Sequence, residues 1–288
     1  MEVPVRRVAR VGDHLEVSAP PSPETTFRLV RTQEQRGAVT SFLLAQGWVG
    51  LHLGDSLRRL QDRGDELSLL ALFGTSGEVR AVALSQPGRL NLLAPLAQDR
   101  PAAERLIAER LDSLERFSCL ESQLPLELTN RFDVYVRDVT VAATVRVPAR
   151  PLCPVRPAVA ADAPDLYRIY DSVSWMRLDS PQHWAERLAS ERTFVAEVDG
   201  HLAAVARWTK SYGRVVEVGG VATDPVLRRR GGATAVVLAA TAAALSEQMT
   251  PVLCFGEPAL GALYHPLGFE RVGRELAFRR RPPASMGI

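Results

Sequence analysis

The stretch from Val215 to Val237, VVEVGGVATDPVLRRRGGATAVV, constrains the fold of this chain more than any other. Its first part, Val215–Thr223, is rich in β-branched residues and predicts a strand that ends at Asp224. The Ala/Val/Leu-rich stretch that starts near Gly231 and runs to about Gln248 predicts a helix. The two elements meet at a short basic turn, so we expect a strand–turn–helix unit here.

The turn and the start of the helix predict an anion site. The residues concerned are Arg228, Arg229, Arg230, Gly231, Gly232, Ala233 and Thr234. The first N–H groups of a helix have no partner within the helix, and the helix dipole favours negative charge there. The two glycines lack a Cβ, so a phosphate can approach the backbone closely. A nucleic-acid patch is the alternative, but the glycines and the apolar helix favour a diphosphate.

The same residues carry a family resemblance. Arg228, Gly231 and Ala233 spell Arg-x-x-Gly-x-Ala after a strand that holds Val221, with Pro225 between them. This pattern resembles the acyl-CoA signature of the Gcn5-related N-acetyltransferases, in which the loop amides hold the CoA pyrophosphate. The resemblance implies acetyl-CoA as cofactor. It also implies that the backbone of Val221, Ala222 and Thr223 pairs with the pantetheine arm, with the Val221 N–H polarising the thioester carbonyl.

A second motif, Leu263-Tyr-His-Pro-Leu-Gly-Phe269, resembles the Leu-Tyr-x-x-x-Gly-Phe element of that family. It lies about 35 residues after the first motif, which leaves room for one helix, one strand and a second helix. Gly268 suits the left-handed position just past a helix end. Pro266 departs from a regular last turn and is expected to shorten a helix predicted over 258–267.

Two residues are candidates for proton transfer. Glu217 lies eleven residues before Arg228, where histone-type relatives place a catalytic glutamate, and is the candidate base. With a strand period of two, Glu217, Gly219 and Val221 would share one face. Tyr264 is the candidate acid, because a phenol stays protonated at neutral pH and can donate to the CoA sulfur. The alternatives are an exposed or ion-paired strand carboxylate for Glu217 and, for Tyr264, an aromatic ring that packs a helix on the sheet.

One position departs from the resemblance. Many relatives carry asparagine at the positions of Glu257 and Gly261, and the second asparagine often contacts CoA. Gly261 removes that contact, which leaves a second interpretation open: the chain could bind acyl-CoA as a sensor without turnover.

The two halves of the chain have similar sequence patterns. Gly88-Arg89 falls where Gly213-Arg214 falls about 125 residues later. We therefore predict an α/β fold with mixed sheets and two tandem acetyltransferase-like domains, residues 1–147 and 148–288. The turn of the first half, Ala97–Pro101, lacks glycine and has one basic residue. It cannot build the same phosphate site, so the first half resembles a degenerate copy, as in tandem members of the superfamily such as mycothiol synthase.

Composition narrows the class of protein. The net charge of +2 is too near neutral to indicate a nucleic acid or an anionic membrane as partner. Cys119, Cys153 and Cys254 show no C-x-x-C pattern, which favours a reducing cytoplasm and no metal site. The start of the chain lacks an apolar signal core, and the apolar run Ala233–Leu245 is shorter than the roughly 20 residues that span a bilayer.

These patterns together predict a cytoplasmic, acetyl-CoA-dependent N-acetyltransferase. The resemblance implies direct transfer to a small-molecule or peptide amine, with no covalent enzyme intermediate. The acyl-CoA-binding regulatory protein is the alternative, and substitution of Glu217 separates the two.

Overall fold

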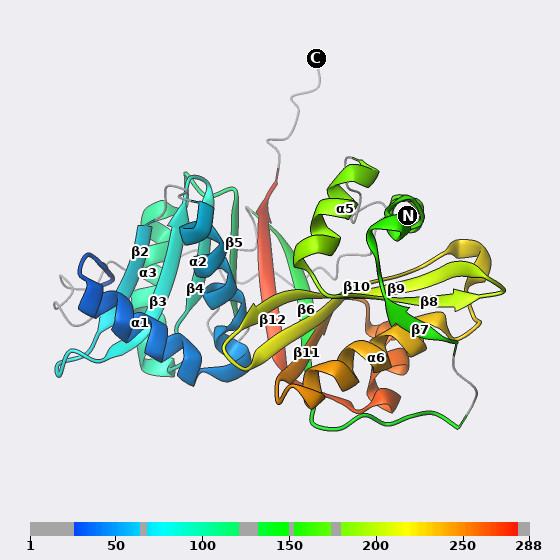
Figure 1. Cartoon of the computed structure of the whole chain (residues 1–288). Coiled ribbons are helices and arrows are strands. Elements are labelled where there is room, and N and C mark those ends of the chain that lie inside the picture. Colours follow the sequence, from blue (N-terminus) through cyan, green and yellow to red (C-terminus); the bar gives the residue numbers. More distant parts are fainter. Residues whose placement is uncertain (1–25, 64–67, 121–131, 150–152, 174–179, 282–288) are drawn as a thin grey trace, which may run out of the picture. The chain divides into compact units, whose positions relative to one another are not determined.

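The structure is a computed structural model that describes residues 26–63, 68–120, 132–149, 153–173 and 180–281. It divides into two compact units: unit 1 comprises residues 1–138 and 273–288, and unit 2 comprises residues 139–272. Two strands, β6 (Phe132–Ala142) and β12 (Phe269–Arg280), each contribute residues to both units (Figure 1). The units therefore differ from the predicted ranges 1–147 and 148–288, because the chain re-enters unit 1 at Gly273.

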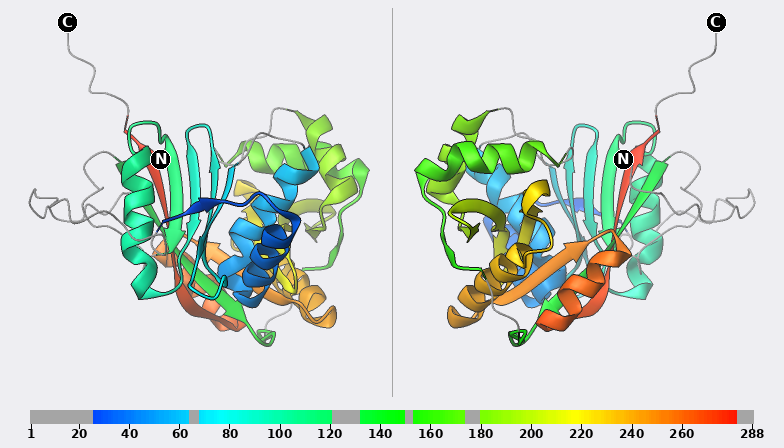
Figure 2. Two further views of the ribbon diagram at one scale, coloured as in Figure 1. Left: turned by 90° about the vertical axis from the view of Figure 1, so that its left-hand side faces the viewer. Right: turned by 90° about the vertical axis from the view of Figure 1, so that its right-hand side faces the viewer.

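Unit 1 is built around a sheet that is antiparallel except for one parallel pair of strands. Its elements are β1 (Arg28–Leu29), α1 (Gln33–Ala45), α2 (Leu51–Arg63), β2 (Ser68–Phe73), β3 (Val79–Gln86), β4 (Arg89–Leu93), α3 (Arg100–Arg110) and β5 (Arg116–Leu120). Strands β1 to β4 pair in order and antiparallel, β4 and β5 pair parallel, and β12 pairs with β5. Helix α3 covers one face of these strands, and α1 and α2 cover the other (Figure 2). The hairpin that the sequence suggests over residues 1–20 lies outside the described residues.

Unit 2 repeats this order of elements. Its elements are β7 (Val155–Pro157), α4 (Ala163–Asp171), α5 (Pro181–Ser190), β8 (Thr193–Val198), β9 (His201–Tyr212), β10 (Val215–Thr223), α6 (Gly232–Ser246), β11 (Thr250–Phe255) and α7 (Gly261–Tyr264). Strands β7 to β10 pair antiparallel and in order, and β10 and β11 pair parallel. In each unit a strand, two helices, three antiparallel strands, a helix and a parallel strand follow one another.

The last strand of each set comes from the other half of the sequence. Strand β12 pairs with β5 through residues 275–279, and β6 lies next to β11. The Thr140 hydroxyl of β6 donates a hydrogen bond of 2.8 Å to the Leu253 carbonyl of β11. Each half of the chain thus supplies an end strand to the sheet of the other unit.

The sheet of unit 2 buries both faces. On one face, Ala204 and Val218 pack with Val236 and Ala240 of α6. On the other face, Val195, Leu202 and Val205 pack with α4 and α5. Figure 1 shows α5 and α6 on opposite sides of β8–β10. Because both faces are covered, the strands consist mainly of small and β-branched apolar residues.

The segment after β11 is less regular than one helix. A 3₁₀ turn over Pro258–Leu260 precedes α7, and another over His265–Leu267 follows it. Pro266 has no N–H to continue an α-helix, which explains the early end of α7. Gly268 ends the segment with φ +104°, in the left-handed conformation expected of it. Among the described residues, no helix is long and apolar enough to cross a membrane.

Candidate active site

Pairing between β10 and β11 covers only the first three residues of each strand. Parallel pairing runs from Val215↔Thr250 to Glu217↔Val252. Beyond that point β10 continues to Thr223 and β11 to Phe255, but no further pair joins them among the described residues. The interval in which the two strands are not paired therefore begins beside Glu217, and we call this interval the opening. The backbone of residues 218–223 lines one side of this opening and can pair with an extended ligand.

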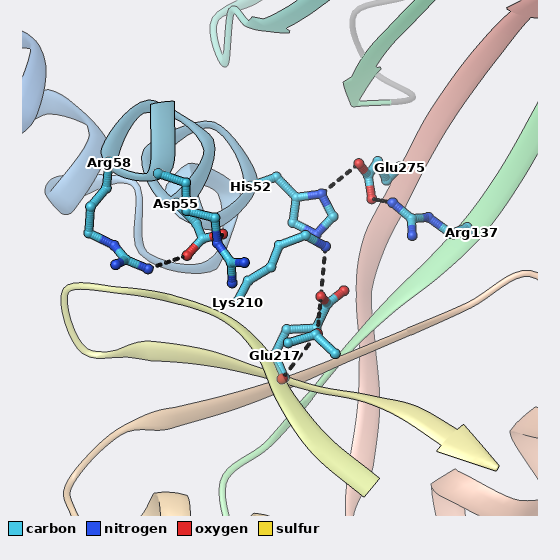
Figure 3. Close-up of polar contacts among 9 residues, drawn as sticks. His52, Asp55, Arg58, Arg137, Lys210, Glu217 and Glu275 are labelled. Atoms are coloured by element: carbon cyan, nitrogen blue, oxygen red, sulfur yellow. Dashed lines mark hydrogen bonds and ion pairs between the residues drawn. The ribbon is translucent and has the colours of Figure 1, made fainter. Parts of the chain in front are cut away.

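A bulge in β9 determines the surroundings of Glu217. Lys210 pairs with Glu217 and Trp208 with Val218, so Thr209 is an extra residue that has no partner of its own on β10. Thr209 and Lys210 both reach the same carboxylate oxygen. The Thr209 hydroxyl lies 2.6 Å from Glu217 Oε2. The Lys210 ammonium lies 2.7 Å from the same oxygen, and Figure 3 shows it pointing towards this carboxylate. Glu217 is buried, with 5% of its surface exposed, and forms an ion pair with Lys210, so of the two alternatives to a base the exposed carboxylate is excluded and the ion-paired one remains.

A second register shift changes the face to which Val221 belongs. Gly219 pairs with Arg207 and Ala222 with Val205, so β10 has one residue more than β9 in this interval. Val221 packs against the cluster that contains Val218, on the α6 side of the sheet. The prediction that Glu217, Gly219 and Val221 share one face is therefore wrong for Val221, because the bulge breaks the period of two.

Gly219 and Gly220 are required by close neighbours. A Cβ on Gly219 would lie 2.9 Å from Thr209 Oγ1, so the hydroxyl of Thr209 takes the space that the missing side chain leaves. Gly220 has φ +59°, and a Cβ there would lie 2.8 Å from Arg207 Nε. The Tyr170 hydroxyl donates a hydrogen bond to the Gly220 carbonyl, and burial raises the pKa of this phenol to about 12. Tyr170 thus fixes the bulge from the α4 side.

Asp224 anchors the turn that follows β10. Its N–H donates to the Ala203 carbonyl at 2.9 Å, and its carboxylate accepts the Val226 N–H at 3.0 Å. Arg168 of α4 forms an ion pair with this buried carboxylate and holds its pKa below the usual range. The 3₁₀ turn Pro225–Leu227 therefore begins at a capped residue that is tied to both β9 and α4.

The turn enters α6 through two left-handed residues. Arg229 has φ +67° and Gly231, the N-cap of α6, has φ +88°. No side chain of the described residues caps this helix end. Nothing lies within 4 Å of the position that a Cβ on Gly231 would take, whereas a Cβ on Gly232 would lie 3.0 Å from the Ala204 Cβ. Gly231 therefore faces open space and Gly232 lets α6 approach β9 closely.

The three arginines of the turn differ in their contacts. Arg230 forms an ion pair of 2.6 Å with Asp199, and its carbonyl accepts the Cys153 thiol at 3.2 Å. Arg228 and Arg229 are exposed, and neither side chain forms a hydrogen bond or ion pair with a described residue. Two guanidinium groups are thus available to an anion at the start of α6, while Arg230 mainly orders the turn.

The remaining predicted cofactor residues lie on both sides of this turn. Ala222 is buried against α4, and Val221 and Thr223 are half-buried in β10. Ala233 is half-buried and Thr234 buried in the first turn of α6. Side chains of these residues serve the packing, so any contact with a ligand in the opening belongs to their backbone.

Tyr264 lies at the end of α7 among aromatic rings. Its ring centroid lies 5.4 Å from that of Phe255 and 6.4 Å from that of Phe269. Burial raises the pKa of the Tyr264 hydroxyl to about 12, so this group stays protonated at neutral pH. No residue of the described part of the chain hydrogen-bonds this hydroxyl. A donor held protonated and without a protein acceptor fits the predicted acid.

The imidazole of His265 accounts for Gly261. A Cβ on Gly261 would lie 3.0 Å from His265 Nε2, and the other ring nitrogen lies 2.8 Å from the Phe269 carbonyl. His265 is exposed overall, and the contact of its ring with the Phe269 carbonyl holds the other side of the ring over Gly261. The glycine therefore has a packing reason here.

Sequence reasoning missed Thr209, Lys210 and Asp224. For Lys210 the sequence did contain a signal, the two-residue turn Gly213-Arg214. Such a turn pairs Tyr212 with Val215, and counting two residues outward along each strand pairs Lys210 with Glu217. No local signal identifies Thr209, since its role depends on the bulge.

A separate cavity of about 390 Å³ lies in unit 2 where β8 begins, between the end of α5 and α6. Ser190, Arg192 and Glu247 are among its lining residues. None of the predicted site residues lines it, so we assign it no part in the site.

Comparison with known proteins supports the resemblance drawn from the motifs. Residues 159–269 match the model of the acetyltransferase (GNAT) family. No curated protein matches the chain. Among solved structures, the GCN5-related N-acetyltransferase from Sphaerobacter thermophilus is similar over 90% of this chain and 97% of its own, with 16% identity and a TM-score of 0.58. An acetyltransferase from the GNAT family of Colwellia psychrerythraea is similar over 89% of this chain and 100% of its own, with 12% identity and a TM-score of 0.59.

A protein from Drosophila is similar to the same extent. It covers 89% of this chain and 98% of its own, with 14% identity and a TM-score of 0.60. At these identities the likeness establishes the fold, and it extends over both units of the chain.

Proposed function

Residues 159–269 form a domain of the acetyltransferase (GNAT) family, and from this premise we propose that unit 2 transfers an acetyl group from acetyl-CoA directly to an amine. One observation carries the proposal. The opening between β10 and β11 begins beside a buried glutamate, and the turn that follows β10 leads to a helix end that no side chain of the described residues caps. An extended thioester ligand with a diphosphate at one end matches both features.

Acetyl-CoA would bind along the opening, with its diphosphate at the start of α6. The N–H groups at the start of α6 would hold the diphosphate, with Arg228 and Arg229 adding positive charge. The backbone of Val221, Ala222 and Thr223 would pair with the pantetheine arm, and the Val221 N–H would polarise the thioester carbonyl. Acetyl-CoA supplies the activated acetyl group.

Proton transfer would involve two side chains of this unit. Glu217 would take a proton from the acceptor ammonium, because its carboxylate already holds one ammonium, that of Lys210, at 2.7 Å. Tyr264 would donate a proton to the leaving CoA sulfur, since burial keeps its hydroxyl protonated. Holding amine and thioester together would supply much of the rate. Unit 1, with its glycine-free turn, would support unit 2 or shape the acceptor side.

Substitution of Glu217 tests this function against the sensor alternative. In Glu217→Gln the rate of CoA release with an amine panel is expected to fall by about 10²–10⁴-fold, while the Kd for acetyl-CoA stays the same. Asp162→Asn is the matched control, because Asp162 is also a buried carboxylate of unit 2 and accepts Arg156 at 2.7 Å.

The outcomes separate the alternatives. An unchanged rate in Glu217→Gln would remove the base assignment. A wild-type chain that binds acetyl-CoA but releases no CoA with any amine would establish the binding protein instead.

A further inference from the structure

Lys210 is the only lysine in the chain, and its ammonium lies on the candidate base. We propose that Lys210 is itself an acetyl acceptor, so that the protein acetylates its own lysine at this site. The inference rests on the proposed function, because it uses the same donor and the same carboxylate.

The fold places this amine where an acceptor amine must be. Lys210 and Glu217 are direct cross-strand partners, so their side chains project from the same face of β9 and β10. The distance from Lys210 Nζ to Glu217 Oε2 is 2.7 Å, within the reach that proton transfer requires (Figure 3). An acceptor from solution would have to bring its own ammonium to this same oxygen.

The pair also lies at the end of the opening. Pairing of β10 with β11 stops at Glu217↔Val252, four residues before Val221, whose N–H would polarise the thioester carbonyl. A lysine side chain is flexible over four methylene groups, so its amine can turn from the carboxylate towards a thioester in the opening. The side chain of Lys210 is 26% exposed and that of Glu217 is 7% exposed, so the amine has access to the ligand while the carboxylate stays shielded.

The chemistry balances without a further reactant. Glu217 takes one proton from the Lys210 ammonium, and the neutral amine attacks the carbonyl carbon of acetyl-CoA. The N–C bond forms and the C–S bond breaks. The second proton leaves the nitrogen as the CoA thiolate is protonated, so that acetyl-lysine and CoA thiol result. The proton on Glu217 returns to solvent.

Intramolecular placement favours this reaction over acetylation of a free amine. The amine is already bound, so no translational or rotational freedom is lost when the acceptor meets the donor. The product has no positive charge, and Glu217 then no longer faces an ammonium from its own chain.

The test is to incubate the purified full-length protein with isotope-labelled acetyl-CoA and to map the label by peptide mass spectrometry after hydroxylamine treatment, which removes thioesters. The expected result is one label at Lys210, with a rate constant that does not depend on protein concentration. Glu217→Gln is expected to slow it by about 10²-fold or more. Lys210→Arg keeps a cation opposite Glu217 and shows any label that falls elsewhere, including the N-terminal amine.

Three results would overturn the inference. A label at Lys210 that forms equally fast in Glu217→Gln or in the urea-unfolded chain would reduce it to ordinary solution chemistry. Transfer to external amines without any label on Lys210 would refute the inference and leave the proposed function standing. Absence of acetyl-CoA binding in a calorimetric titration would refute both.

Discussion

Gly231 and Gly77 form a matched pair that isolates the role of the α6 turn. Both have positive φ, +88° and +84°, and nothing lies within 4 Å of the position of a Cβ on either residue. Alanine at each position therefore meets the same backbone strain and no steric clash. The left-handed conformation costs an L-residue about 1–2 kcal/mol. We expect Gly231→Ala and Gly77→Ala to lower the free energy of unfolding by this same amount.

The two variants are expected to differ in ligand affinity. A methyl group on Gly231 would enter the open space at the start of α6, where the diphosphate is proposed to bind. Loss of about 1.4 kcal/mol of binding energy, which is modest for one displaced charged contact, raises Kd about 10-fold. Gly77 belongs to a turn of unit 1, so its variant is expected to keep the affinity of the wild type.

Urea unfolding followed by circular dichroism measures the free energy of unfolding of each variant. Isothermal titration calorimetry measures its Kd for acetyl-CoA. Gly232→Ala adds a third comparison, because its Cβ would press on the Ala204 Cβ at 3.0 Å and affect the packing of α6 on β9. Equal acetyl-CoA affinity in all three variants would refute the assignment of the diphosphate to this turn.

Two further predictions concern buried groups. Tyr264→Phe keeps the ring packed between Phe255 and Phe269 but removes the hydroxyl. Turnover is therefore expected to fall by about 10-fold or more, with little loss of stability. An unchanged rate would exclude the acid role of Tyr264. The Tyr264 pKa of about 12 lies above its ordinary value of 10.0, so its contribution to stability is present below pH 10 and lost as the pH rises towards 12. In the difference between wild-type and Tyr264→Phe ultraviolet titrations, ionisation near pH 10 would contradict the buried environment. Asp224 has its pKa held below the ordinary 3.8 by Arg168, so its contribution is present above that pH and lost as the pH falls through the folded value. Asp224→Asn is therefore expected to lose less stability between neutral and acid pH than the wild type. Urea unfolding midpoints of both proteins at the two pH values measure this difference. An equal drop in midpoint in both proteins would count against the ion pair.

Much of the local structure of unit 2 could be predicted from the sequence. The range of β10 agrees with the predicted strand Val215–Thr223. Runs of β-branched residues between glycine turns determine such elements locally. The left-handed conformation of Gly268 was likewise expected from the helix end that it follows.

The features that depend on distant contacts could not be predicted. The exchange of β6 and β12 between the sheets arises from pairing across the whole chain, for which no single segment carries a signal. The bulges in β9 and β10 add one residue each and so decide that Thr209 faces Glu217 and that Val221 does not. Only packing against neighbouring strands determines where such a residue is inserted.

The most direct test of the account is a calorimetric titration of acetyl-CoA into the full-length protein, in which the number of sites is read together with the affinity. The account predicts one site per chain, weakened in Gly231→Ala and retained in Gly77→Ala, because within the described ranges the turn before α6 joins an uncapped helix end to two exposed arginines. Two sites per chain, or no heat of binding at millimolar acetyl-CoA, would contradict it.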